Sequence, residues 1–135
     1  MLGAEALTDK IRMGALSGRR LLVAEDRYLL ASDLEALLST YGAQVLGPCA
    51  TLSEALSLAA QADGALLDVD LGGEQVFPVA EQLRARNCAV VFVTGHGVEQ
   101  RPAAWARSPW LQKPCDPYEA VAALAQALDG TNASG

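Results

Sequence analysis

The sequence alternates short apolar runs with longer stretches of helical period, and this alternation restricts the folds that the chain can adopt. The apolar runs are short enough to be strands and lie at 21–24, 44–46, 65–69, 89–93 and 110–112. Strands that alternate with helices pair in parallel, because each helix carries the chain back to the edge where the next strand begins. The chain is therefore predicted to be an α/β domain with a doubly wound, five-stranded parallel sheet.

The stretches between the apolar runs carry start and stop signals for helices. Apolar residues at helical spacing predict helices over about 28–41, 51–62, 78–87 and 117–129. Thr51 and Glu54 have the spacing of a capping box, and Asp116 is an N-cap residue followed by proline at the first helical position. Between 97 and 108, Pro102 interrupts the pattern, so this segment is expected to hold only a short or irregular helix.

Composition narrows the class of protein. The 135 residues fit one domain, and 51% hydrophobic residues can form a core without disulfides. The formal net charge of −6 lacks the basic excess of nucleic-acid-binding proteins, so direct binding of nucleic acid is not expected. No apolar stretch reaches the roughly 18 residues of a membrane span, so we expect a cytoplasmic protein without membrane contact. Cys49, Cys88 and Cys115 are odd in number and widely spaced, which favours reduced thiols.

The two ends of the chain differ from its centre. The folded domain is expected to span 19–129. Residues 1–18 have apolar residues at helix-compatible spacing, but Gly3 and Gly14 weaken a helix, so we expect a flexible N-terminal extension. Small and polar residues end the chain, and 130–135 is expected to be a disordered tail.

Polar side chains occur where four of the five predicted strands end. They are Glu25 and Asp26 after the first strand, Asp68 in the third, Thr94 after the fourth and Lys113 after the fifth. Ligands of an open parallel sheet bind outside the carboxyl ends of its strands. These five side chains are therefore expected to meet at one edge of the sheet and form the candidate site.

The three carboxylates predict a cation at this edge. At a separation of ~4 Å, each pair of like charges costs on the order of 4 kcal/mol at an effective dielectric constant of 20. Carboxylates, a backbone carbonyl and water are the ligands that magnesium prefers, and Lys113 adds a second positive charge. Such a cluster suits phosphoryl transfer, in which the protein positions the group and neutralises the charge on its oxygens. Asp68 is the predicted nucleophile.

Four short motifs together carry a resemblance to a known family. They are Glu25-Asp26, Leu66-Leu67-Asp68, Phe92-Val93-Thr94-Gly95 and Lys113-Pro114. In this order they resemble the receiver domain of two-component response regulators, over about residues 19–128. The resemblance implies a flavodoxin-like topology with strand order 2-1-3-4-5. The third motif is similar to the Phe-Ala-Thr-Gly motif of a branch of stand-alone receivers.

The resemblance implies a role for each acidic residue. Asp68 would accept a phosphoryl group from a histidine kinase or a histidine phosphotransfer protein. Asp26 and Asp68 would bind Mg²⁺ directly, with the backbone carbonyl of Asp70 as a third ligand. Glu25 would act through a water molecule on the metal.

The resemblance also assigns roles to residues after the fourth and fifth strands. Thr94 would hydrogen-bond the phosphoryl group, and Lys113 would pair with it beside a cis bond to Pro114. Trp110, three residues before Lys113, occupies the position of the aromatic switch residue. The chain would then be a signalling domain and not an enzyme, although it would promote its own phosphorylation and dephosphorylation. It would act by contact with an unknown downstream protein, and a homodimer stays open.

Other interpretations stay open on the sequence alone. Asp68-Val69-Asp70 also resembles the nucleophile motif of haloacid-dehalogenase-type phosphatases, although that motif normally ends a first strand. An interaction module that is never phosphorylated is another alternative, but it leaves the acid, threonine and lysine set unexplained. The side chain of Asp70 is either a surface acid or a group that affects hydrolysis of the acyl phosphate. His96 stands where an aromatic residue is common, and an exposed loop position is expected for it.

Overall fold

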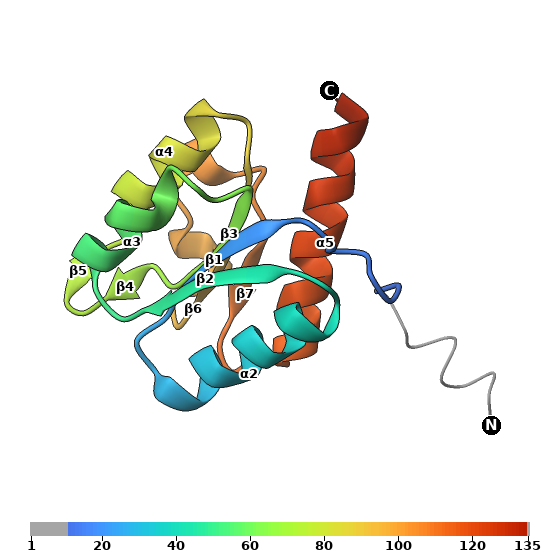
Figure 1. Ribbon diagram of the computed structural model, residues 1–135. Coiled ribbons are helices and arrows are strands. Elements are labelled where there is room, and N and C mark those ends of the chain that lie inside the picture. The colour runs from blue at the N-terminus through green and yellow to red at the C-terminus, as the bar shows by residue number, and fades with distance from the viewer. Residues whose placement is uncertain (1–10, 135) are drawn as a thin grey trace.

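A parallel sheet of five strands forms the centre of the protein (Figure 1). The computed structural model describes residues 11–134, and residues 1–10 and 135 lie outside that part. The strands are β1 (Arg20–Ala24), β2 (Gln44–Cys49), β3 (Gly64–Leu67), β6 (Ala89–Thr94) and β7 (Trp110–Gln112). Their order is β2-β1-β3-β6-β7, which confirms the predicted order 2-1-3-4-5.

Helices cover both faces of this sheet (Figure 1). They are α2 (Tyr28–Thr40) and α5 (Pro117–Ser134) on one face, and α3 (Leu52–Ala59) and α4 (Phe77–Ala85) on the other. In β1, Leu21 packs in the core beneath α2 and α5, whereas Leu22 packs in the core beneath α3 and α4. Because both faces are covered, nearly every residue of β1 and every residue of β6 is buried.

A small antiparallel hairpin follows β3 and was not predicted from the sequence. Its strands are β4 (Asp70–Leu71) and β5 (Glu74–Gln75). Gly72 and Gly73 form the turn with φ values of 58° and 87°, a conformation that favours glycine. The Gly72-Gly73 pair is the sequence signal from which this hairpin could have been predicted.

The segment between β6 and β7 has no long helix. It contains two short 3₁₀ helices, Val98–Gln100 and Ala103–Trp105, which confirms the irregular segment predicted there. The ring of Trp105 is buried and packs against Phe92 at a centroid distance of 5.4 Å, and Trp110 packs against the same ring at 5.3 Å. An aromatic cluster therefore covers this part of the sheet.

At both ends of the described chain, regular structure or packing extends beyond the predicted domain boundaries. Residues 11–18 form turns in which Ile11 and Leu16 are buried, so this part of the predicted extension packs on the domain. Residues 1–10, the rest of that extension, lie outside the described residues. Helix α5 continues through Gly130 to Ser134, into the segment predicted as a tail. Among residues 11–134, no helix combines the length and apolar character of a membrane span.

Candidate functional site

Backbone hydrogen bonds fix the main chain of the site residues at the carboxyl edge of the sheet. The N–H groups of Glu25, Asp68 and Lys113 donate to the carbonyls of Cys49, Ala24 and Thr94, at 2.9, 2.8 and 2.7 Å respectively. Each bond joins two neighbouring strands at, or just beyond, the point where their apolar residues end. The polar residues are therefore held by the sheet itself.

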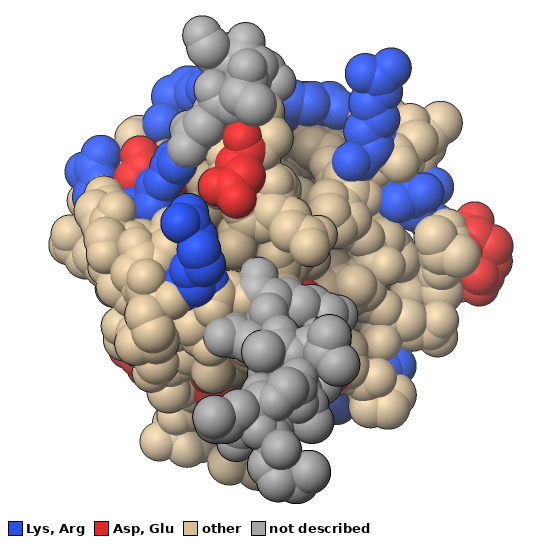
Figure 2. Space-filling view, turned by 90° about the vertical axis from the view of Figure 1, so that its right-hand side faces the viewer, with Lys and Arg blue, Asp and Glu red and all other residues tan. Residues whose placement is uncertain are grey.

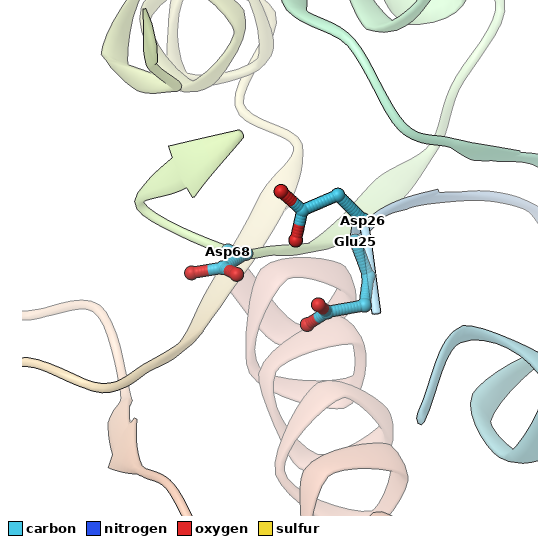
Figure 3. A group of neighbouring side chains, drawn as sticks. All are labelled: Glu25, Asp26 and Asp68. Carbon is cyan, nitrogen blue, oxygen red and sulfur yellow. The ribbon is translucent and has the colours of Figure 1, made fainter. Parts of the chain in front are cut away.

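Three carboxylates converge at this edge (Figure 3). One carboxylate oxygen from each of Glu25, Asp26 and Asp68 lies within 4.8 Å of the other two. Figure 3 shows that Glu25 and Asp26 turn their carboxylates toward the space beside Asp68. Glu25 and Asp68 are only 3% and 7% exposed, whereas Asp26 is exposed. The cluster therefore carries negative charge at a partly desolvated place.

The amine of Lys113 lies between two of these carboxylates. Its Nζ is 2.8 Å from Oε1 of Glu25 and 2.9 Å from Oδ2 of Asp68. Burial of the amine lowers its pKa, but the hydrogen bonds to Glu25 and Asp68 outweigh this effect, so the pKa of Lys113 is raised. The bond to Pro114 is cis, as the resemblance implied. Lys113 therefore provides a stable positive charge next to Asp68.

Glu25 remains short of positive charge despite this amine. Burial of its carboxylate raises the pKa of Glu25, and the hydrogen bonds from Lys113 and from the N–H of Arg27, at 2.9 Å, offset the increase only in part. The neighbouring charge of Asp68 raises the pKa further. A cation at this position would stabilise the ionised form of Glu25.

Asp26, Asp68 and Lys113 line an open cleft of about 470 Å³. The lining residues are Asp26, Arg27, Asp68, Asp70, Gly95, Lys113 and Pro114. Arg27 was not singled out from the sequence, although it directly follows the acidic pair, and Gly95 was named only as the last residue of a motif. At Gly95, a Cβ atom would meet no other atom within 4 Å, so the cleft is open there. The cleft has the size of a small-ligand site.

His96 links the cleft to the irregular segment after β6. Its Nε2 lies 2.5 Å from Oδ2 of Asp70, and its Nδ1 lies 2.6 Å from Oε1 of Gln100. The side chain of His96 is 39% exposed, and that of Asp70 is 57% exposed. The sequence indicated an exposed loop histidine, and the side chain of His96 is indeed exposed in part, but both of its ring nitrogens are bonded.

Thr94 and Trp110 lie behind the cleft. Both are buried, with exposed fractions of 0% and 9%. Oγ1 of Thr94 accepts a hydrogen bond from the N–H of His96 at 3.2 Å, and Nε1 of Trp110 donates to the carbonyl of His96 at 3.0 Å. The residues that line the cleft include neither of them. The indole of Trp110 thus occupies an inward position.

The pKa of His96 should report its contact with Asp70. The hydrogen bond to Asp70, followed by that to Gln100, raises this pKa above its ordinary value of 6.5. His96 is the only histidine of the sequence, so a proton NMR titration is expected to show one imidazole with a pKa above 6.5.

Because the folded-state pKa is the higher one, the stability that His96 contributes is fully present below its unfolded-state pKa. It is lost as the pH rises through the folded-state pKa. The substitution Asp70→Asn should return the pKa toward its ordinary value. An imidazole that titrates at or below 6.5 in the native protein would contradict the Asp70–His96 pair.

The donor set fits a hard divalent cation. The residues that could hold it, Glu25, Asp26 and Asp68, offer only carboxylate oxygens, the ligand type that magnesium prefers. The N–H of Gly72 donates to Oδ2 of Asp26 at 3.2 Å, so the β4–β5 hairpin orients the exposed acid. The role of the Asp70 backbone carbonyl as a further metal ligand stays a prediction.

Charge is distributed unevenly over the molecule. Figure 2 shows the side turned away from the β4–β5 hairpin, where Lys and Arg side chains are more prominent than Asp and Glu. The converging carboxylates lie at the carboxyl edge of the sheet instead. A local excess of negative charge at the cleft attracts cations.

Comparison with models of protein families gives no match. Among curated proteins, the chain is similar to the phyllosphere-induced regulator PhyR of Methylorubrum extorquens, with 31% identity over 119 residues that cover 80% of this chain and 43% of PhyR. Among solved structures, the response regulator PhyR from Brucella abortus matches with a TM-score of 0.73 and 28% identity, over 90% of this chain and 52% of that chain. This chain thus spans about half the length of these relatives.

A third match isolates the part of PhyR that this chain resembles. The receiver (REC) domain of Erythrobacter litoralis PhyR has the same fold, with a TM-score of 0.69 and 22% identity over 84% of this chain and 92% of that domain. The sheet order, the strand-end residues and these similarities agree. The chain has the fold of the receiver domains of response regulators and is similar in sequence to PhyR.

Proposed function

We propose that this receiver domain accepts a phosphoryl group on Asp68 from the phosphohistidine of a histidine kinase or a histidine phosphotransfer protein. The observation that carries the proposal is the position of Asp68, 2.9 Å from the Lys113 amine and beside two further carboxylates in an open cleft. A purely structural ion pair would need neither the extra carboxylates nor access to solvent. The phosphorylated domain then signals by contact with another protein.

The proposed transfer is a single displacement at phosphorus. A carboxylate oxygen of Asp68 attacks the phosphorus, and a P–O bond forms while the P–N bond to the donor imidazole breaks. The imidazole nitrogen keeps the electron pair of the broken bond. The products are an acyl phosphate on Asp68 and an unphosphorylated donor histidine.

Lys113 and Thr94 stabilise the transferred group in this proposal. The raised pKa of Lys113 keeps its amine charged near neutral pH, so it pairs with a phosphoryl oxygen. Thr94 must move to donate a hydrogen bond to another oxygen, because its side chain is fully buried.

Glu25, Asp26 and Asp68 would hold magnesium in the same cleft. When bound, magnesium supplies positive charge that neutralises the phosphoryl oxygens. Asp26 is exposed, whereas Glu25 and Asp68 are buried, and all three would offer carboxylate oxygens to the ion. Incubation of the chain with magnesium and phosphoramidate, or with a phosphorylated histidine kinase, tests the proposal through the mass of one acid-labile phosphoryl group.

Trp110 is the proposed element that transmits phosphorylation. Its indole donates to the carbonyl of His96, and the N–H of His96 donates to Thr94. A shift of Thr94 toward the phosphoryl group therefore alters the backbone that holds the indole. The surface formed by β7, α5 and the two 3₁₀ helices is where we expect the downstream protein to bind.

The donor protein is expected to dock beside the cleft at the start of α2. Tyr28 and Leu29 are 80% and 77% exposed there, directly after the cleft residue Arg27. We expect Leu29→Asp to slow transfer from a phosphorylated kinase about tenfold, because it places a charge in an apolar contact. Labelling by phosphoramidate, which needs no docking, should not change.

Met13→Asp is the matched control for Leu29→Asp. Met13 is 75% exposed and precedes β1, at the opposite edge of the sheet. Transfer from the kinase should be unaffected in this variant. Equal losses in the two variants, or a Leu29→Asp loss that is the same with phosphoramidate, would exclude this docking position.

A further inference from the structure

The N–H, the carbonyl and both ring nitrogens of His96 are all bonded, and these bonds connect four segments of the chain. Its N–H donates to Thr94, and its carbonyl accepts from Trp110. Its ring nitrogens contact Asp70 of the hairpin and Gln100 of the first 3₁₀ helix. Few orientations of the imidazole satisfy these contacts together, so the ring is fixed at this position.

The Asp70–His96 contact lies on the boundary between two hollows. Asp70 lines the cleft that contains Asp68, whereas His96 lines a neighbouring cavity of about 280 Å³. The contact thus joins a residue that lines the cleft to a residue that lines the neighbouring pocket. Asp70 stays close to the phosphoacceptor through its backbone, since its N–H is 3.4 Å from Oδ1 of Asp68.

We propose that His96 is a positioning residue that holds the Asp70 carboxylate at the rim of the cleft and thereby raises the rate at which Asp68 is phosphorylated. This inference rests on the proposed function. The Nε2–H of His96 donates to Asp70, and the contact with Gln100 fixes the ring that makes this bond.

The physical reason is the charge that already lines the cleft. Asp68 has Lys113 as its partner, and Asp26 accepts from the N–H of Gly72. An incoming phosphoryl donor brings further negative charge. Without His96, the carboxylate of Asp70 would be free to turn over Asp68, two residues away, and to repel that donor.

Phosphorylation rates with two small donors test the proposal. Acetyl phosphate carries more negative charge than phosphoramidate, so repulsion by Asp70 should affect it more. We expect His96→Ala to slow labelling by acetyl phosphate roughly three- to tenfold, and labelling by phosphoramidate less. The double variant Asp70→Asn/His96→Ala should return to within about twofold of the native rate, because the repelling charge is gone.

Gln100→Ala, which removes one contact of the ring but leaves Asp70 within reach of Nε2, should slow labelling by acetyl phosphate less than His96→Ala does. A His96→Ala rate equal to or above the native rate overturns the proposal. So does a double variant that stays as slow as His96→Ala, because the role of His96 would then be structural.

If His96→Ala does not fold, the variant Asp70→Asn alone tests the proposal. This variant should be labelled at least as fast as the native chain. Slower labelling overturns the proposal. Native protein that neither donor labels would refute the proposed function and this inference together. Labelled native protein with an unaffected His96→Ala variant refutes only the inference.

Discussion

Replacing Asp68 with asparagine is expected to abolish phosphorylation of the protein. The amide lacks the anionic oxygen that attacks phosphorus, so no acyl phosphate can form. The fold should persist, because asparagine has nearly the same shape and Lys113 keeps Glu25 as a partner at 2.8 Å. Intact-mass measurement after incubation with magnesium and phosphoramidate, followed by peptide mapping, checks this result.

The matched control for Asp68→Asn is Asp70→Asn, since Asp70 is the other acid of the Asp68-Val69-Asp70 sequence. This variant should still carry the phosphoryl group on Asp68. The label should also be released by hydroxylamine, as expected for an acyl phosphate. Undiminished labelling of Asp68→Asn that resists acid and hydroxylamine would show that Asp68 is not the acceptor.

Removing the charge of Asp26 is expected to raise the thermal stability of the metal-free protein and to weaken the stabilisation that magnesium provides. In metal-free buffer, Asp26→Asn should raise the Tm by about 2–6 °C, because it relieves repulsion with Glu25 and Asp68. The asparagine side chain can still accept from the N–H of Gly72. Millimolar magnesium should raise the Tm of the native protein by mass action, and this increase should decline or vanish in the variant.

Asp33→Asn is the control for Asp26→Asn, because it makes the same change of charge at another exposed acid, within α2. Its metal-free Tm should stay close to that of the native protein, and its response to magnesium should be retained. If magnesium leaves the native Tm unchanged and the two variants behave alike, the acidic cluster is not a metal site.

The sequence was sufficient to predict the sheet and the acids that meet at its edge. The positions of the strands and helices follow from the spacing of apolar residues, which is a local property of the chain, whereas the strand order was implied by the resemblance to receiver domains. Parallel strands necessarily place their carboxyl ends together, so Glu25, Asp68 and Lys113 could be predicted to meet without any knowledge of loops. The place of Asp68 after β3, with the acidic pair upstream after β1, also disfavours the dehalogenase-type alternative.

Only the tertiary structure decided which groups the loops bring to that edge. His96 and Asp70 are 26 residues apart, and their contact depends on how the hairpin and the 3₁₀ helices pack. The inward position of Trp110 likewise follows from its packing against Phe92 and its bond to the carbonyl of His96.

The boundaries of the domain were likewise decided by the tertiary structure and not by local sequence signals. Gly130 suggested the end of the last helix, but α5 continues past it to Ser134. Ile11 and Leu16 lie in a segment with weak local signals, yet the core buries both side chains. Apolar periodicity therefore determined the strands, the helices and the acids at the strand ends. The loop contacts and the domain boundaries depended on side-chain packing between segments distant in the sequence, which local spacing does not encode.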